Sequence, residues 1–492
     1  MSQAATPSTS TGQLIIRYFK DFGVLKDTRK EYWGIQIINF LDCSFYFAML
    51  TIATVFLSQD LGLDDKQAGY STAIFTSATS LMLFISGMCT DWLGIKKSLN
   101  ISMWALLALR LAVVVIGLSP GLPNRGLMVS ALFFLMAPFM AGVQTVFQSA
   151  CQRFTTKRSR SAGFNLWYLF MNVGAAVAGF SIDIIRKLLH LPNVHIFTMG
   201  VLTAVLCLIV GVLMVKREEQ LVSPDAEPEA QKEEVKVRSK PPLQAIRDVV
   251  REPTLWRLLV LIALILGVRA VYAYLYLLMP KYWLRTIGPD ANIGTLNAIN
   301  PIGIVIGLIL FIPITNKFNV FKMLIYGAMI SAFSLFPLAV PWDLYSHDIA
   351  RAHYLMAIVC MVIVTIGEVA WSPKLYEYTA AIAPKGQEGI YLGLSLIPWF
   401  LAKTLVSAFS GHFLEYWSPE KVTVNGTLMP LQQALLQHQL PYWRTPGAMW
   451  LVLGLYALAG CIIALFLRGW LTRGTEAKTE EENNKAKPDQ PD

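Results

Sequence analysis

Long apolar runs alternate with short polar segments along most of this 492-residue chain. A helix needs about 20 consecutive apolar residues to cross the hydrocarbon of a bilayer, and each run is close to that length. The pattern predicts an all-α integral membrane protein with twelve transmembrane helices. The expected spans are 33–57, 68–90, 98–118, 127–150, 164–183, 195–215, 255–280, 293–315, 320–341, 354–375, 389–414 and 446–470.

A longer polar segment divides the runs into two groups of six. Residues 216–254 are rich in Glu, Lys and Pro, as expected for the linker of a transporter built from two bundles. We therefore predict a cytoplasmic N-terminal segment (1–32), an N-terminal six-helix bundle (33–215), a cytoplasmic linker (216–254), a C-terminal six-helix bundle (255–470) and a disordered cytoplasmic tail (471–492).

Basic residues concentrate in alternate loops, for example Lys96 with Lys97 and Lys216 with Arg217. The positive-inside rule places these loops and both termini in the cytoplasm. The opposite loops, such as residues 58–66, are acidic or mixed. The first run begins too deep in the chain and is too long for a cleaved secretory signal. We expect a multi-pass membrane protein, with a bacterial inner membrane as our hypothesis for its location.

The composition narrows the class of protein. Hydrophobic residues make up 55% of the chain and the mean hydropathy is +0.50, which excludes an ordinary water-soluble globule. The net charge of +9 does not indicate a nucleic-acid partner, because Lys and Arg lie in loops rather than on one stripe. The six cysteines lie in or beside apolar runs without metal-binding spacing, so we expect them to be small core residues. We also expect no metal, no cofactor and no enzymatic chemistry.

A short basic turn joins the second and third runs. In it, Gly87 and Gly94 would permit close packing, Asp91 could cap or pair at a helix end, and Lys96 and Lys97 would stay in the cytoplasm. The spacing G-x-x-x-D-x-x-G-x-K-K resembles the loop signature of the major facilitator superfamily, in which case these five residues form a cytoplasmic gate motif. The alternative is an ordinary positively charged membrane turn.

Five charged residues stand out by their position in the apolar runs: Asp42, Arg110, Arg269, Glu368 and Lys403. Such a charge costs about 2.5–3.5 kcal/mol at a helix centre and persists only when paired or hydrated. Arg269 is the most informative, because its guanidinium cannot lose its proton. Tyr272 and Tyr276 follow on the same helix face. Arg269 either binds an acidic ligand group or pairs with Glu368 or Asp42.

Glu368 is a candidate site for a proton or an ammonium group, because a buried carboxyl can hold either. Trp371 and Ser372 share its helix face, and Pro373 predicts that the helix breaks there. The alternative is a neutral Glu368 bonded to the backbone. Asp42 is the second candidate for proton coupling, whereas Arg110 and Lys403 are expected to form structural pairs.

Four separated stretches resemble the proton-dependent oligopeptide transporters: Ser161–Gly174, Leu296–Pro301, Gly367–Pro373 and Ala383–Gly386. In that family, an Asn of helix five, an Asn of helix eight and a Glu of helix ten surround the amino end of a bound peptide. The resemblance implies these roles for Asn172, Asn300 and Glu368. A carboxylate and two amide oxygens suit an ammonium group.

Other positions depart from that family. The first run should read E-x-x-E-R, but residues 39–46 contain no Arg and only one acid, Asp42. The Lys of helix four is replaced by Gln144 or a neighbour, and the acid of helix seven is absent, with Arg269 nearby. The usual proton relay is therefore not preserved, and the pocket for a peptide carboxylate is altered. The linker is also too short for two additional helices.

The sequence predicts a monomeric secondary transporter, driven by protons through Glu368 or Asp42. Its solute would be a small peptide or another amino-group-bearing compound, with an acidic group as a further option. Alternating access would expose a midplane site between the bundles. The expected site residues are Glu368, Asn300, Asn172, Arg269, Tyr46, Tyr272, Trp399 and Gln144. A uniporter, an exchanger, an exporter of an amphipathic compound and a non-transporting receptor or scaffold remain alternatives.

Overall fold

The structure is a computed structural model that describes residues 23–155, 159–215, 252–315, 319–382 and 397–472. Within these ranges, eight helices are long and apolar enough to span a membrane, and the bent pair α10 and α11 adds a ninth. The all-α membrane fold is therefore confirmed. The other three expected spans, α3, α13 and α17, are helical but do not reach that combination of length and hydropathy in their described residues. A total of twelve spans therefore stays a prediction, because α3, α13 and α17 are not confirmed as membrane spans.

The N-terminal bundle consists of long helices joined by short turns. A short 3-10 turn, η1, precedes it, and two π-helical turns, η2 and η3, extend helices α2 and α6. The bounds are η1 Gly23–Asp27, α2 Lys30–Val55, η2 Phe56–Asp60, α3 Asp65–Leu93, α4 Ile95–Gly117, α5 Arg125–Arg153, α6 Arg160–Asp183, η3 Ile184–Leu188 and α7 Val194–Met214.

The C-terminal bundle is less regular, because its first span is broken and its outer end carries several short elements. The bounds are α10 Pro253–Leu264, α11 Leu266–Leu277, α12 Met279–Thr286, α13 Ile293–Thr315, α14 Val320–Phe333, η5 Phe336–Leu338, η6 Trp342–Leu344, α15 Ile349–Ile382, α17 Ile397–Trp417, β1 Lys421–Val424, β2 Thr427–Pro430, α18 Leu431–Leu436, η7 Tyr442–Arg444, α19 Pro446–Phe466 and α20 Arg468–Leu471.

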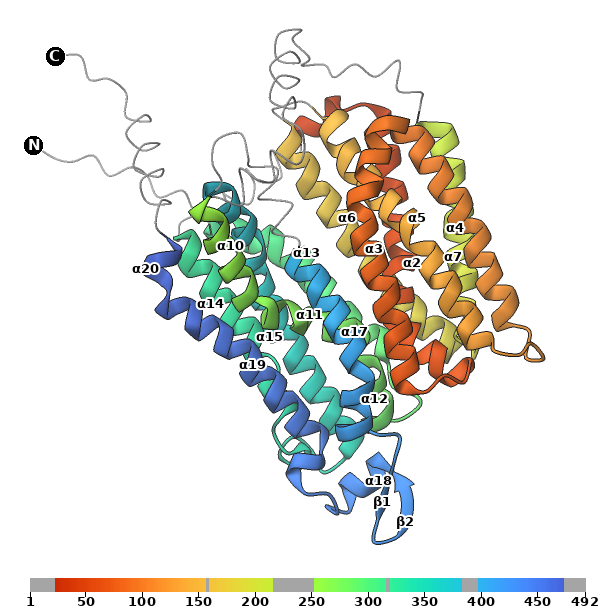
Figure 1. Ribbon diagram of the computed structural model, residues 1–492, viewed down its shortest axis with the longest axis vertical. Helices are drawn as coiled ribbons and strands as arrows, with labels where there is room; N and C mark the ends of the chain where they lie inside the picture. The colour runs from red at the N-terminus through yellow and green to blue at the C-terminus, as the bar shows by residue number, and fades with distance from the viewer. Residues whose placement is uncertain (1–22, 156–158, 216–251, 316–318, 383–396, 473–492) are drawn as a thin grey trace, which may run out of the picture.

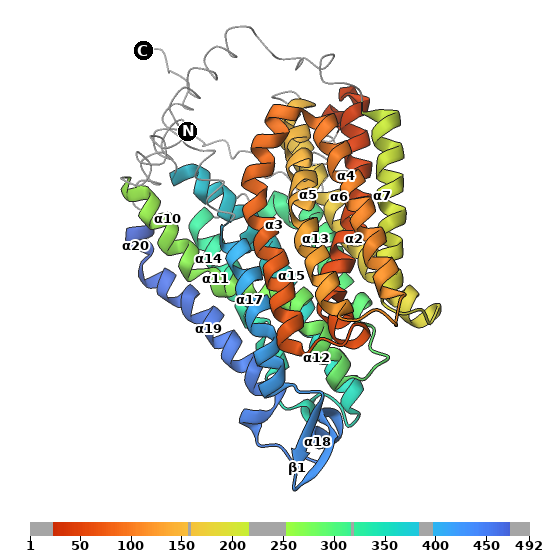
Figure 2. The ribbon, with the colours of Figure 1, turned by 45° about the vertical axis from the view of Figure 1, so that its right-hand side comes forward.

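The two groups of helices lie side by side, and the short elements α12, α18, β1 and β2 lie together at one end (Figure 1). In the turned view α12, α18 and β1 again lie at one end of the molecule (Figure 2). The turn between α3 and α4, with Lys96 and Lys97, lies at the opposite end. The positive-inside rule therefore predicts that the end with α12, β1 and β2 faces outward, and we call it the outer end. The assigned domain boundaries stay predictions, because residues 1–22, 216–251 and 473–492 lie outside the described ranges.

Asp65 joins the two bundles at the outer end. Its carboxylate accepts hydrogen bonds from Lys281 Nζ at 2.7 Å and from Arg285 Nη2 at 2.6 Å, both on α12. Arg285 also donates to the backbone oxygen of Ser418 at 2.6 Å. Lys281 is only 3% exposed, so this cluster is a largely desolvated ion network. It ties the start of α3 to the C-terminal bundle.

Backbone contact closes the outer end between α6 and α13. A Cβ on Gly294 would lie 2.0 Å from the carbonyl oxygen of Gly179, so no side chain fits at this crossing. Asp183 accepts hydrogen bonds from the backbone nitrogens of Gly294 at 3.0 Å and Thr295 at 2.6 Å. The acid thereby satisfies exposed amides at the start of α13. The outer ends of the bundles are therefore closed against each other.

The core of the N-terminal bundle contains an ion pair. Arg110 Nη2 donates to Asp42 Oδ1 at 2.7 Å, and Arg110 Nη1 donates to the carbonyl oxygen of Gly200 at 3.0 Å. The guanidinium carbon lies 4.1 Å from the centre of the Phe45 ring. Because both charges are buried and paired, the pair joins α2, α4 and α7. The structural role expected for Arg110 is confirmed.

Two helices differ from their predicted form. Pro373 does not end its helix, because α15 continues to Ile382; the break predicted there is wrong. A proline removes one helical hydrogen bond, but close packing supports the helix here: a Cβ on Gly327 of α14 would lie 2.9 Å from Ala370 of α15. The seventh span is instead the broken one, with a 44° bend between α10 and α11.

The segment between α17 and α19 contains an antiparallel hairpin. Strands β1 and β2 pair with Val424 opposite Thr427. Asn425 and Gly426 connect them with φ angles of 49° and 78°, which is the two-residue turn that an Asn-Gly pair favours. The hairpin and α18 form a small structured cap on the outer end.

Replacing Asp42 should destabilise the protein. Asp42→Asn would leave the buried Arg110 guanidinium without its carboxylate, and loss of one partner of such a pair costs about 3–5 kcal/mol. We expect a clearly lower unfolding temperature in a fixed detergent, partly restored in the Asp42→Leu, Arg110→Met double variant. Asp290→Asn, at an exposed position, is the control. An Asp42→Asn protein as stable as wild type would contradict a structural pair.

Outer closure should be insensitive to pH in the physiological range. Burial raises the pKa of the Asp65 carboxyl, but Lys281 and Arg285 lower it further, so the net shift is downward. The stabilisation is then complete above the ordinary aspartate pKa of about 3.9 and is lost only as the pH falls through the lowered value. Closure should therefore be constant between about pH 5 and pH 8.

Cysteine labelling tests this expectation. Ser77 bonds to Thr404 of the other bundle at 2.9 Å, so Ser77→Cys should react with an impermeant thiol reagent from outside only when the outer end opens. Labelling should be flat from about pH 5 to pH 8 and should rise at all pH values when Asp65→Asn is added. Glu420→Gln is the control. Labelling that rises at pH 5 with Asp65 intact would refute the assignment.

Candidate functional site

Glu368 and Asn300 meet where α15 packs against α13. Asn300 Nδ2 donates to Glu368 Oε2 at 3.0 Å and to Thr365 Oγ1 at 3.2 Å. Asn300 and Thr365 are buried, and Glu368 is half-buried. The structure thus brings together two of the three residues implied by the peptide-transporter resemblance. This hydrogen bond to Glu368 comes from the Asn300 side chain. The described contacts of Glu368 do not include the backbone hydrogen bond considered as an alternative.

Arg269 is buried on α11 without a carboxylate partner in the described structure. It is 7% exposed, and its Nε and Nη2 atoms have no hydrogen-bond partner. Its guanidinium carbon lies 4.4 Å from the centre of the Trp371 ring, a favourable cation–π position. Glu368 is within electrostatic range but forms no ion pair with it, and Asp42 pairs with Arg110 instead. The structural pairing considered for Arg269 is therefore not formed.

Tyr272 holds Trp371 in place beneath Arg269. Its hydroxyl lies 2.6 Å from Ser331 Oγ and accepts a hydrogen bond from Trp371 Nε1 at 3.0 Å. Tyr272 is only 4% exposed. Its hydroxyl is thus used inside the C-terminal bundle, so we assign Tyr272 to positioning the aromatic ring on which Arg269 rests. Direct contact of Tyr272 with a solute stays a prediction.

Aromatic rings connect the two bundles near Glu368. Phe47 of α2 lies 5.2 Å from the ring of Tyr46 and 5.5 Å from the ring of Tyr276 on α11. Tyr276 is within electrostatic range of both Glu368 and Tyr46. Tyr46 therefore reaches the neighbourhood of Glu368 from the opposite bundle, as expected for a residue that lines a central site.

Lys403 is a second buried cation in the C-terminal bundle. It is 5% exposed on α17, and among the described residues it has no ion-pair partner. Its Nζ atom lies 5.0 Å from the ring centre of Trp399 and 5.6 Å from that of Phe400. The pairing with a carboxylate expected for Lys403 is therefore not found, and ring contacts replace it.

Among the described residues, no hydrogen bond or ion pair joins the remaining predicted site residues to this cluster. Asn172 is buried on α6, where its Nδ2 donates to the backbone oxygen of Tyr168 at 2.9 Å. Gln144 is half-buried on α5. Asp42 is committed to Arg110, which favours a structural role over proton coupling. Roles for Asn172 and Gln144 in binding stay predictions.

The turn between α3 and α4 owes its form to Gly94. This residue ends α3 with a φ angle of 86°, and its nitrogen donates to the Thr90 oxygen at 3.0 Å. A positive φ favours glycine, so the conformation explains this position. No described atom lies within 4 Å of a Cβ built on Gly87, so the described residues give no support for close packing there, which stays a prediction. Lys96 is half-buried and Lys97 exposed.

The Asp91 side chain and the stretch Ala383–Gly386 lie outside the described part of the structure. Of the six cysteines, five are buried as expected, but Cys89 is exposed. A role of the Gly87–Lys97 turn as a cytoplasmic gate stays a prediction.

Sequence reasoning missed two residues of the cluster. Thr365 precedes Glu368 by three residues on α15, so a helical-face argument could have found it. Ser331 lies on α14 and reaches Tyr272 and Trp371 only through packing; no sequence signal marks it. Together the cluster offers a carboxylate with an amide beside it and an uncompensated guanidinium nearby. Such a set can bind charged groups, and it contains no arrangement for covalent chemistry among the described residues.

Comparisons with known proteins agree with this fold. The sequence profile of the Major Facilitator Superfamily matches residues 33–406. No curated protein matches the sequence significantly. The peptide transporter POT in complex with sulfate is a similar solved structure, with a TM-score of 0.66 and 16% identity, covering 95% of this chain and 99% of that chain.

Two further structures are similar. A POT family transporter in complex with 5-aminolevulinic acid has a TM-score of 0.66 and 14% identity, covering 90% of this chain and 96% of that chain. A D-xylose-proton symporter has a TM-score of 0.61 and 13% identity, covering 90% of this chain and 97% of that chain. At these identities the likeness establishes the fold. Because the superfamily profile covers most of the sequence, the chain belongs to the major facilitator superfamily, a family of membrane transporters rather than enzymes, and resembles its peptide transporters.

Proposed function

We propose that this protein is a proton-coupled secondary transporter for a small organic solute, such as a short peptide, that carries both an amino group and an acidic group. The observation that carries the proposal is Arg269, a buried cation whose Nε and Nη2 atoms have no partner. A solute carboxylate or similar anion would supply the missing acceptors, because a guanidinium binds such groups through two parallel hydrogen bonds.

The charge balance of the C-terminal bundle supports an acidic ligand. Arg269 and Lys403 are buried cations without ion pairs among the described residues, and Glu368 is the carboxylate within electrostatic range of Arg269. An uncompensated charge is costly in hydrocarbon and is retained mainly at functional sites. A solute that brings one negative group would lower that cost. The ring contacts of both cations offset part of it in the absence of solute.

The amino group of the solute would bind at Glu368. The carboxylate already accepts from Asn300 through Oε2, which leaves further lone pairs for an ammonium group. One structurally similar transporter has 5-aminolevulinic acid bound, a molecule with an amino group and a carboxylate, so the fold accommodates this class of solute. Asn172 would add an amide oxygen from the opposite bundle.

Glu368 is also our candidate for the coupled proton. Asp42 is less suitable, because its protonation would leave Arg110 unpaired inside the N-terminal bundle. A proton on Glu368 removes a negative charge near Arg269, which strengthens binding of the acidic group and weakens binding of the amino group. Proton and solute affinities are then linked through one carboxyl.

Alternating access follows from the two bundles. The outer ends meet through Asp65 and through Gly179 with Gly294, so a solute would enter from outside only after these contacts open. A bacterial inner membrane and a monomeric state are parts of the proposal that the sequence alone supports.

A thermal-shift screen of the purified protein tests the solute class. Dipeptides should raise the unfolding temperature, because a ligand at about 100 times its dissociation constant adds roughly 2.7 kcal/mol to the free energy of unfolding. The same dipeptides with an amidated carboxyl or an acetylated amine should give smaller shifts. If amidated dipeptides and simple amines are equally effective, the solute does not need its acidic group and the proposal fails.

Glu368→Gln should uncouple transport from protons without unfolding the protein. The glutamine oxygen can still accept from Asn300, so stability should change little, while the group can no longer bind a proton. Uptake into proteoliposomes should lose its dependence on a pH gradient. Glu420→Gln, at an exposed outer position, should behave as wild type. Gradient-driven uptake that survives in Glu368→Gln would move the proton site elsewhere.

Arg269→Lys should weaken solute binding about 10- to 100-fold, because the ammonium cannot reproduce the planar pair of donors and a charged hydrogen bond contributes about 1.5–3 kcal/mol. Binding of the amidated solute should be equal in wild type and Arg269→Lys, since it lacks the acidic group. Arg351→Lys, on the exposed start of α15, is the matched control. Normal affinity for the acidic solute in Arg269→Lys would exclude Arg269 as its anchor.

A further inference from the structure

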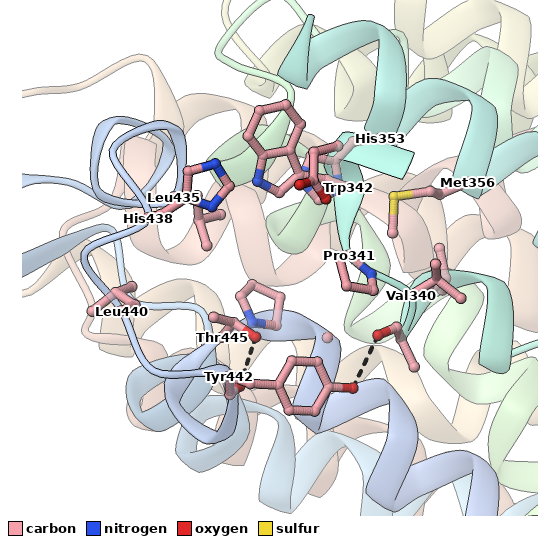
Figure 3. Close-up of a pocket in the computed structure, with 15 residues that line it drawn as sticks. Val340, Pro341, Trp342, His353, Met356, Leu435, His438, Leu440, Tyr442 and Thr445 are labelled. Atoms are coloured by element: carbon pink, nitrogen blue, oxygen red, sulfur yellow. Dashed lines mark hydrogen bonds between the residues drawn. The ribbon is translucent and has the colours of Figure 1, made fainter. Parts of the chain in front are cut away.

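A cavity of about 200 Å³ lies at the outer end of the C-terminal bundle (Figure 3), and neither Glu368 nor Arg269 belongs to its lining. Its walls come from the segment between α14 and α15, the start of α15, the segment from α18 to η7 and the start of α19. All these segments belong to the outer side of the fold. The cavity is thus accessible to solutes outside the cell without any movement of the bundles.

Aromatic rings form much of the cavity wall. Trp342 and His438 stack with ring centres 5.7 Å apart and an angle of 15° between their planes. Tyr442 extends across the opposite side of the cavity, where its hydroxyl donates to the backbone oxygen of Ala339 at 2.9 Å. Since that bond fixes the phenol, the ring presents a stable aromatic surface.

The lining contains one acidic side chain, Asp343, and two histidines, His353 and His438. Asp343 belongs to the lining and is exposed, and no hydrogen bond or ion pair involves its carboxylate among the described residues. No Lys or Arg belongs to the lining. Aromatic faces carry negative electrostatic potential and attract organic cations, an effect used in sites for quaternary ammonium ligands. A free carboxylate next to such faces adds to that preference.

The size of the cavity limits the ligand. An apolar cavity of about 150 Å³ can hold benzene, so 200 Å³ accommodates a compact ammonium group with a short apolar or hydroxylated chain. The opening beside Asp343 and His438, both exposed, would leave part of a longer molecule in water.

We propose that this cavity binds a small organic cation of the alkylammonium class, with the ammonium between the rings of Trp342 and Tyr442 and beside Asp343. The site is separate from the transport site and differs from it in ligand charge. It exists on the outer face while the outer ends of the bundles are closed.

Choline and its neutral carbon analogue 3,3-dimethylbutan-1-ol provide matched probes, because they have the same shape and differ in charge. In saturation-transfer NMR with the purified full chain, choline should bind at least about tenfold more tightly than the alcohol. Asp343→Asn and Trp342→Leu should each weaken choline binding about tenfold. Asp290→Asn, an exposed outer acid that does not line the cavity, should have no effect.

Glu368→Gln distinguishes this site from the central one. Choline binding should be unchanged in that variant, whatever happens to uptake, so failure of the proposed transport function would leave this proposal intact. Equal affinity for choline and the neutral alcohol, or full choline binding in Asp343→Asn, would overturn the proposal. Loss of choline binding in Glu368→Gln would also overturn it, because the cation would then occupy the transport site.

Discussion

Charge compensation inside hydrocarbon is the constraint on which this structure depends. The N-terminal bundle meets it internally: Asp42 and Arg110 pair at 2.7 Å and a backbone oxygen satisfies another guanidinium nitrogen. The C-terminal bundle does not. The Arg269 guanidinium lies over the ring of Trp371, and its Nε and Nη2 atoms have no hydrogen-bond partner among the described residues. Among the described residues, the Asp42–Arg110 pair is thus compensated within its own bundle, whereas we propose that a bound solute supplies the missing partners of Arg269.

This asymmetry agrees with the departures from the peptide-transporter pattern. Proteins of that family were expected to hold charge in the first and fourth helices, whereas this chain has a single acid on α2, neutralised by α4. The unpaired charge lies instead on α11. If Arg269 binds the acidic group of the solute as we propose, both charged groups of the solute would bind to the C-terminal bundle, and the N-terminal bundle would contribute mainly aromatic and amide groups.

The sequence predicted the fold well, because hydrophobic length and loop charge are sufficient to indicate membrane helices. It also predicted that Glu368 and Asn300 belong together, since a resemblance carried both. It did not predict that Arg269 forms an ion pair with neither Asp42 nor Glu368 among the described residues, because only packing decides whether these side chains meet. The continuation of α15 through Pro373 likewise depends on contact with α14. By contrast, the hairpin was predictable from Asn425-Gly426 between β-branched residues.

The outer closure combines two kinds of contact with different sensitivities. The Asp65 carboxylate is about one-fifth exposed, so dissolved ions screen its attraction to Lys281 and Arg285 in part. The backbone contact of Gly179 with Gly294 is steric and independent of ionic strength. A rise in external salt would therefore weaken one half of the closure and leave the other unchanged. The balance between outward and inward forms would in this way depend on the ionic strength outside the cell, even for a solute that carries no net charge.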